Sequence, residues 1–230
     1  EKRLSVFQTL NTVSQAVSVE TDLNEFYKVV QHEVTSIIGN VNFAVAIYDS
    51  QHDTIAIPYM FDGQTTRSVD TFPMGEGLTS ILIRTKKSLL VVEDTERKTH
   101  ELGAKMVGKP AKSWLGVPLL VGGEVIGAIL LQDLEQEGRF DEDDQLLMET
   151  LAAQVAVAIR NARLLEKTYQ QAYRQQQLYE ITSKIRNSPD IPSILKTTAS
   201  ELGRVLGAQR TKIELGTVSP ALQKTEPPES

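Results

Sequence analysis

The stretch that decides the fold reads SWLGVPLLVGGEVIGAILLQDLEQEGRFDEDDQLLMETLAAQVAVAI and runs from Ser113 to Ile159. Two apolar segments flank the pair Gly122-Gly123, which is typical of the tight turn in a β-hairpin. After Phe140 the apolar residues change to helical spacing, and a helix is expected from Asp141 onward. The stretch therefore predicts two antiparallel strands followed directly by a long helix.

The chain before this stretch has the pattern of helices followed by strands. Apolar residues recur at helical spacing over residues 4–19. Asp22 and Gly39 have the residue types that begin and end a second helix between them. Short runs rich in β-branched and aromatic residues then predict three strands, Phe43–Asp49, Thr54–Phe61 and Arg67–Phe72. The polar segment Thr95–Lys112 is predicted as a mobile loop with one short helix.

Between the third strand and this loop, Phe72–Asp94 reads FPMGEGLTSILIRTKKSLLVVED and has the features of a small-molecule site. Glycines on both sides of Glu76 allow a sharp turn and a close approach of the backbone to a ligand. A short amphipathic helix, Leu78–Arg84, follows them, and its first N–H groups are free to bind a polar ligand group. A strand over Leu89–Val92 closes the segment.

Eight residues are candidate ligand contacts because they lie in this segment or beside it. The alternatives stay open: Glu76 can be a surface residue of a turn, Asp94 can cap the next loop, and Trp114 can pack in the core. The candidates are Phe72, Gly75, Glu76, Gly77, Leu78, Thr79, Asp94 and Trp114.

Composition narrows the possible functions. The chain has 230 residues, 40% of them hydrophobic, with 30 acidic and 24 basic side chains and a net charge of -6, which argues against nucleic-acid binding. It has no cysteine, so disulfides, thiolate nucleophiles and zinc–sulfur sites are excluded. The apolar runs are too short for a membrane segment, and a cytoplasmic location is expected. Because the chain begins with Glu1, we expect it to be part of a longer protein.

No set of residues predicts an enzyme or a metal site. His32, His52 and His100 are isolated from one another in the sequence. Catalysis needs a nucleophile with a base, or two carboxylates in a cleft. The acidic residues 141–144 begin a helix, where negative charge is favoured, so we interpret them as a cap.

The final long helix carries a heptad pattern from Met148 to Tyr179. Residues 141–186 contain neither proline nor glycine and would form a helix roughly 70 Å long at about 1.5 Å per residue. Such a helix needs a partner, and we predict a homodimer through the same helix of a second subunit. Alternatively, its first half packs on the sheet and its second half is solvated. The predicted interface consists of Met148, Leu151, Val155, Ala158, Ala162, Leu165, Tyr169 and Ala172.

An internal repeat predicts a partial second domain. Residues 10–47 align without a gap on residues 178–215, so that Asp22 meets Asp190 and Gly39 meets Gly207. This second copy would supply the entry helices and one strand. The tail, residues 216–230, is rich in proline and polar residues and is predicted to be disordered.

The order of elements and two stretches, Phe72–Asp94 and Ser113–Ile159, resemble the GAF domain, a small-molecule sensor module of bacterial signalling proteins and phytochromes. The resemblance covers residues 4–165, and residues 178–215 in part. It implies an α+β fold with a central antiparallel sheet of five or six strands, flanking helices and a long dimerising helix. The ligand pocket would lie between the sheet and residues 72–112.

The departures from the family limit the ligand. Covalent bilin and the reduction of free methionine sulfoxide need cysteines, so both are excluded, and any cofactor is unknown. Phe140 and Asp144 match the end of the motif of cyclic-nucleotide-binding members, but position 145 is Gln and the Asn-Lys pair is missing. Cyclic-nucleotide binding is therefore unsupported.

We interpret the chain as a non-enzymatic regulatory sensor module. A small molecule would bind without a covalent bond, and the change would pass through the dimeric helix to an output domain outside this chain, such as a histidine kinase. The alternative is a structural dimerisation module with a vestigial pocket filled by its own side chains.

Overall fold

The structure is a computed structural model that describes residues 23–105, 110–186, 191–205 and 207. The chain divides into two compact units, Glu1–Glu166 and Lys167–Ser230. The helix expected at residues 4–19, the cap Asp22 and the tail from residue 216 lie outside the described residues. Among the described residues, no helix is both long enough and apolar enough to cross a membrane.

The first unit is built on one antiparallel sheet, which confirms the predicted fold class. Within the described residues the sheet has six strands in the order β3-β2-β1-β6-β5-β4. Gly122 and Gly123, both with positive φ, form the predicted turn between the last two strands. The strands are β1 (Asn42–Asp49), β2 (Thr54–Phe61), β3 (Thr66–Pro73), β4 (Leu89–Val91), β5 (Ser113–Val121) and β6 (Glu124–Asp133).

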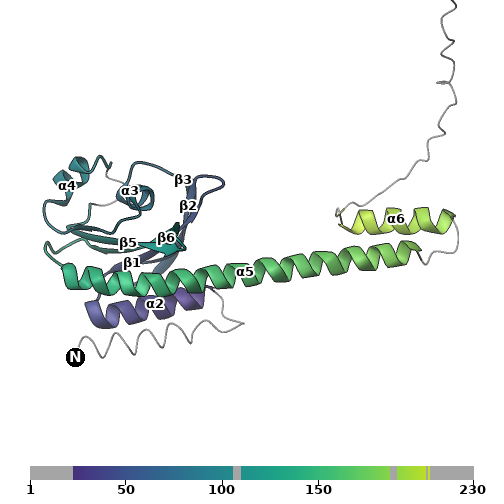
Figure 1. The fold of residues 1–230 in the computed structure, drawn as a ribbon, viewed down its shortest axis with the longest axis horizontal. Coiled ribbons are helices and arrows are strands. Elements are labelled where there is room, and N and C mark those ends of the chain that lie inside the picture. The colour runs from purple at the N-terminus through teal and green to yellow at the C-terminus, as the bar shows by residue number, and fades with distance from the viewer. Residues whose placement is uncertain (1–22, 106–109, 187–190, 206, 208–230) are drawn as a thin grey trace, which may run out of the picture. The chain divides into compact units, whose positions relative to one another are not determined.

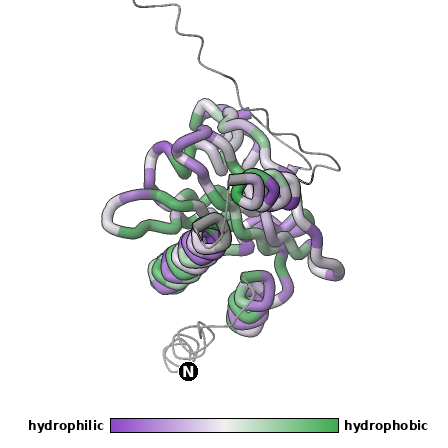
Figure 2. Tube along the Cα trace, turned by 90° about the vertical axis from the view of Figure 1, so that its right-hand side faces the viewer, coloured by the Kyte–Doolittle hydropathy of each residue, from purple (hydrophilic) through white to green (hydrophobic). Residues whose placement is uncertain are grey.

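Helices cover both faces of this sheet (Figure 1). On one face lie α2 (Leu23–Ile38) and the first part of α5 (Glu142–Arg186), and on the other lie α3 (Leu78–Thr85) and α4 (Thr95–Glu101). In Figure 2 the helices carry both hydrophobic and hydrophilic residues around their axes, as helices with one buried side do. Helix α4 is the short helix expected in the polar segment.

The start of α5 is capped as the acidic residues predict. The Asp144 N–H donates to Asp141 Oδ1 at 2.8 Å, and the Asp141 N–H donates to Asp144 Oδ2 at 3.3 Å. These bonds satisfy N–H groups that a helix leaves free at its beginning. The Asp141 and Asp144 carboxylates therefore stabilise the first turn of α5, which follows the last strand of the sheet.

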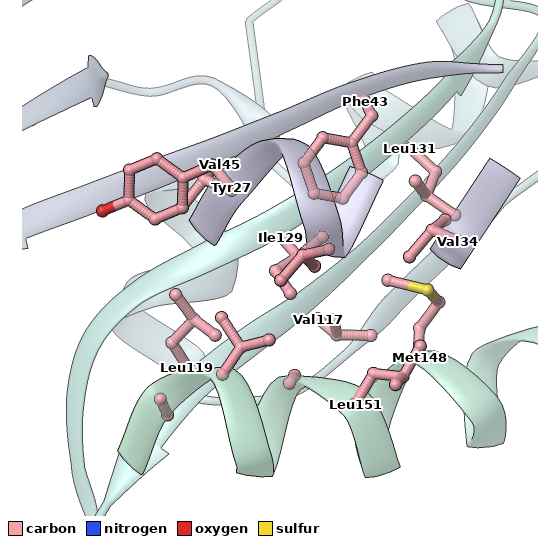
Figure 3. Packing of buried hydrophobic residues seen from close by; sticks show 14 of the residues in the cluster. Tyr27, Val34, Phe43, Val45, Val117, Leu119, Ile129, Leu131, Met148 and Leu151 are labelled. Carbon is pink, nitrogen blue, oxygen red and sulfur yellow. The ribbon is translucent and has the colours of Figure 1, made fainter. Parts of the chain in front are cut away.

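The two faces of the sheet have separate hydrophobic cores, because side chains of a strand point alternately to opposite faces. On the α2–α5 face, Phe43 is paired with Leu131 and Val45 with Ile129, and all four side chains belong to one buried cluster. Figure 3 shows these side chains packed against α2 and α5. Strand residues between them, such as Ala44, belong to a second cluster under α3.

Four of the eight residues in the predicted dimer interface belong to this core instead, which corrects the sequence prediction. Met148, Leu151, Val155 and Ala158 are at most 7% exposed and pack against the sheet of their own domain (Figure 3). They lie out of reach of a second subunit because the sheet already covers them. The pattern itself could not reveal this, since a heptad seam and a core-facing stripe have nearly the same period.

The remaining residues of the predicted dimer interface, from Leu165 onward, are exposed on α5. Leu165 is 37% exposed, Tyr169 60% and Tyr179 76%. Ala162, at the boundary, is half-buried. This division matches the alternative in which the first half of the helix packs on the sheet. Whether a second subunit covers the exposed half stays a prediction.

The second unit contains α6 (Ile191–Val205), at the positions that the repeat makes equivalent to α2. Gly207 has a positive φ of 62°, and its equivalent Gly39 has one of 98°, so a left-handed glycine follows both helices. The strand predicted at residues 210–215 lies outside the described residues. The partial second copy therefore stays a prediction.

Candidate functional site

The loop Gly75–Gly77 enters α3 and is held by polar groups of that helix. The Gly75 N–H donates to Ser80 Oγ at 3.1 Å, and Arg84 Nη2 donates to the Gly75 carbonyl at 2.6 Å. Gly77 precedes the helix with an extended backbone, φ -74° and ψ 166°, and no side chain caps α3 in its place. The loop is therefore fixed from the helix side, and the free start of α3 can meet a ligand.

Glu76 bonds within the protein instead of reaching toward a ligand. Its carboxylate forms an ion pair with Lys105 Nζ, and its carbonyl accepts from the Lys105 N–H at 2.8 Å. The hydrogen bond and positive charge of Lys105 lower the pKa of the Glu76 carboxyl. Both side chains are exposed, so this pair joins the loop before α3 to the segment after α4 at the surface.

Asp94 is the residue just before α4, and its side chain is exposed. Its φ of 51° lies in the left-handed region, and its carboxylate accepts from Arg97 Nε at 2.9 Å. Arg97 also bonds Glu101, and all three side chains are exposed. The carboxylate therefore pairs with Arg97 at the surface and makes no capping hydrogen bond to α4, and ligand contact by Asp94 stays a prediction.

Trp114 lies on the α3 face of the sheet and is 4% exposed. Its ring covers Gly116: a Cβ atom on Gly116 would overlap the Trp114 ring and come within 2.6 Å of Leu82 Cδ1. A glycine within a strand often marks such a close approach. Trp114 therefore forms part of the core at the centre of the candidate site.

The sheet under this site is lined by small residues. Ala44 pairs with Leu130, which pairs with Gly116. In the next row across the same three strands, Ala46 pairs with Ala128 and Ala128 with Pro118. The Trp114 ring and Leu82 of α3 occupy the space above Gly116 in this region.

The predicted contacts are thus only partly brought together. Phe72, Leu78 and Trp114 belong to the same cluster, and Gly75, Glu76 and Gly77 form the loop beside it. Thr79 is half-buried in α3. Sequence reasoning missed Leu82, Gly116 and Lys105. Of these, only Gly116 carries a signal in the sequence, because a glycine inside an apolar strand suggests close packing.

The histidines do not join the site. All three are exposed, and His52 Nδ1 lies 2.7 Å from the Asp49 carboxylate in the turn after β1. Within the part of the chain that the structure describes, no group of three or more His, Asp or Glu side chains is placed to hold a metal ion.

Comparison with known proteins agrees with this architecture. The family model described as GAF domain matches residues 20–160. Among solved structures, a putative GAF sensor protein from Burkholderia vietnamiensis is 20% identical with a TM-score of 0.55, covering 71% of this chain and 99% of that one. The GAF domain of a phosphoenolpyruvate-protein phosphotransferase from Coxiella burnetii is also 20% identical, with a TM-score of 0.55 and coverages of 70% and 96%.

A third similar structure is an enzyme. It is the free methionine-R-sulfoxide reductase of Neisseria meningitidis in complex with its substrate, 18% identical with a TM-score of 0.56, covering 69% of this chain and 90% of that one. At this identity the likeness concerns the fold alone.

Proposed function

Because the chain belongs to the GAF domain family, a regulatory and sensor fold, we propose that it is the sensor module of a signal-transduction protein. A small molecule binds without a covalent bond between the sheet, α3 and α4. The change passes through α5, paired with that of a second subunit, to an output domain in the cytoplasm, such as a histidine kinase. The module itself catalyses no reaction.

The observation that carries this proposal is the sharing of strands between two cores. In β5, Trp114 packs in the cluster under α3, while its neighbour Leu115 packs in the cluster under α5. In β6, Leu130 and Leu131 are divided in the same way. A strand that shifts when a ligand enters one core must also shift in the other, and α5 lies on that second core.

A second contact supports the proposal that a change near α3 is passed on to α5. Lys86, just after α3, donates from Nζ to the carbonyl of Gly123 at 2.8 Å. Gly122 precedes Gly123 in the same turn and lies close to Arg160 of α5. A Cβ atom on Gly122 would be 4.0 Å from Nη1 of Arg160. The β5–β6 turn thus lies between the end of α3 and the signalling helix. A ligand that binds one arrangement of these elements better would shift the population toward it.

The ligand is tested with the single tryptophan of the chain, Trp114, as the reporter. We expect its fluorescence to change when cellular small molecules are titrated into the purified chain. Gly77→Val should abolish the change without lowering the melting temperature, since φ of -74° is allowed for valine. A Gly77→Val protein that responds like the wild type would reject the proposed site.

The dimer is tested on the exposed half of α5. Leu165→Lys combined with Tyr169→Lys should convert a dimer into a monomer in sedimentation experiments, because two charges would be buried between the helices. Leu146→Lys, at a residue of α5 that is 63% exposed, is the control and should leave the dimer unchanged. A wild-type chain that is monomeric at high concentration would reject the dimeric relay.

The alternative, a structural dimerisation module, is favoured by the packing of Trp114 on Gly116, which fills part of the candidate site from within. Native mass spectrometry of the purified chain separates the two functions. A bound small molecule supports the sensor, whereas an empty dimer whose Trp114 fluorescence responds to no small molecule supports the structural module.

A further inference from the structure

One buried side chain on α4 is left without a hydrogen-bond partner. Thr99 is 1% exposed, and its hydroxyl oxygen has no partner in the structure. Other buried polar side chains are satisfied: Ser80 Oγ accepts from the Gly75 N–H, and Ser113 Oγ donates to the Gln136 carbonyl at 2.8 Å. An unpaired buried hydroxyl is unfavourable for folding, so this group needs a physical explanation.

The Thr99 hydroxyl lies on the inner side of α4. Thr95, one helical turn earlier and therefore on the same side, donates from its hydroxyl to the Ala111 carbonyl just before β5. The chain turns back after α4, where the Ala104 N–H donates to the Thr99 carbonyl at 2.9 Å. Both alanines are buried. Thr99 is thus enclosed on the side of α4 where the candidate site lies.

A hydrophobic cluster lies beside this side of α4, because Ala111, which accepts from Thr95, is one of its members. The same buried cluster includes Val91 and Trp114. Two sets of charges near α4 are exposed and paired, Glu76 with Lys105 and Arg97 with two carboxylates. Lys98 of α4 is half-buried. A charged ligand group among these apolar side chains would lose its water, and burying a charge is costly unless an opposite charge meets it.

We propose that the Thr99 hydroxyl is the hydrogen-bonding anchor of the ligand, and that the ligand presents an uncharged polar group to it, such as an amide, a carbonyl or a hydroxyl. This inference rests on the proposed sensor function and names the chemical class of its ligand. A hydroxyl both donates and accepts, so it pairs with each of these groups. The ligand satisfies a group that the empty protein leaves unpaired, which makes binding selective for molecules that carry the matching group.

The first test asks whether the hydroxyl is unpaired in the ligand-free protein. Thr99→Val keeps the shape and removes the hydroxyl, so the melting temperature should rise by about 2–4 °C. Thr95→Val is the matched control on the same side of α4. It removes a hydroxyl that bonds Ala111, so it should lower the melting temperature. A lower melting temperature for Thr99→Val would show that the hydroxyl has a partner and would overturn the inference.

The second test uses benzamide and benzoate, two probes of the same shape, of which only the second is charged. Binding is followed by the amide NMR signals of Thr99 and Ala104. Benzamide should bind more tightly than benzoate, Thr99→Val should weaken its binding about 3–10-fold, and Thr99→Ser should retain it. Preferred binding of benzoate, unchanged binding by Thr99→Val, or binding of neither probe would overturn the inference.

The failure of this inference can be told apart from failure of the sensor function. A charged small molecule that co-purifies with the wild-type chain and changes the Trp114 fluorescence would reject the anchor role of Thr99 and leave the sensor standing. An empty chain that responds to no small molecule would reject both.

Discussion

The two faces of the sheet use the same strands but receive side chains of different size from them. On the α2–α5 face, a row across β1, β6 and β5 consists of Phe43, Leu131 and Leu115. The neighbouring row on the α3–α4 face consists of Ala44, Leu130 and Gly116. Both faces bury large apolar side chains, such as Met148 on the first and Leu82 on the second, but the strands present more small residues to the second face, which also holds the tryptophan. This difference leads us to expect that substitutions of large residues on the first face cost more stability than changes on the second, where we propose the ligand binds.

The largest effect is expected for Leu151→Ala on the α2–α5 face. Leu151 is fully buried among large neighbours (Figure 3), so the variant should lose about 2–5 kcal/mol in the free energy of unfolding. The control Leu146→Ala, on the solvent side of the same helix, should change it by less than about 0.5 kcal/mol. Denaturant unfolding measures both. Equal losses would contradict the assignment of α5 to the core.

A smaller effect is expected for Gly116→Ala on the α3–α4 face. The new methyl group would overlap the Trp114 ring and Leu82, so the variant should lose about 1–3 kcal/mol and shift the Trp114 emission to longer wavelength. At Gly75 the nearest atom to a new Cβ is Ser80 Oγ at 4.0 Å, so Gly75→Ala serves as the tolerated control. Unchanged emission in Gly116→Ala would refute the close packing of Trp114.

The α2–α5 face should also respond to alkaline pH. Burial raises the pKa of the Tyr27 phenol above its usual value near 10, while the charge of Arg163 opposes this shift. Because the folded pKa is raised, the contribution of Tyr27 to stability is complete below about pH 10 and is lost as the pH rises through the folded value. Tyr27→Phe should flatten the fall of melting temperature at alkaline pH. A curve identical to that of the wild type would refute burial of the phenol.

The smallest effect is expected at the exposed pair on the α3–α4 face. Lys105 lowers the pKa of the Glu76 carboxyl, so this pair stabilises above the usual glutamate pKa and the contribution is lost as the pH falls through the lowered value. Lys105→Met should raise the Glu76 pKa toward its usual range in an NMR titration. Asp62, whose pKa is lowered by backbone N–H groups of Thr65 and Gln64, is the control and should not move.

The fold followed from local patterns, and the site did so only in part. The composition of Phe43–Asp49 and the pair Gly122-Gly123 predicted a strand and a turn that the structure contains, because both signals depend on neighbouring residues. The pairing of Glu76 with Lys105 joins residues on two different elements. Such contacts depend on the path of the chain between them, which no local pattern encodes.

The sequence by itself determined the family, the order of the elements and the absence of thiol chemistry, since these depend on residue type and spacing. The tertiary structure decided which partner covers each apolar surface. It placed Met148 and Leu151 against their own sheet, laid Trp114 on Gly116 and buried the Thr99 hydroxyl. The reason is physical: a periodic pattern shows that a face is apolar, but only packing in three dimensions selects what lies on it.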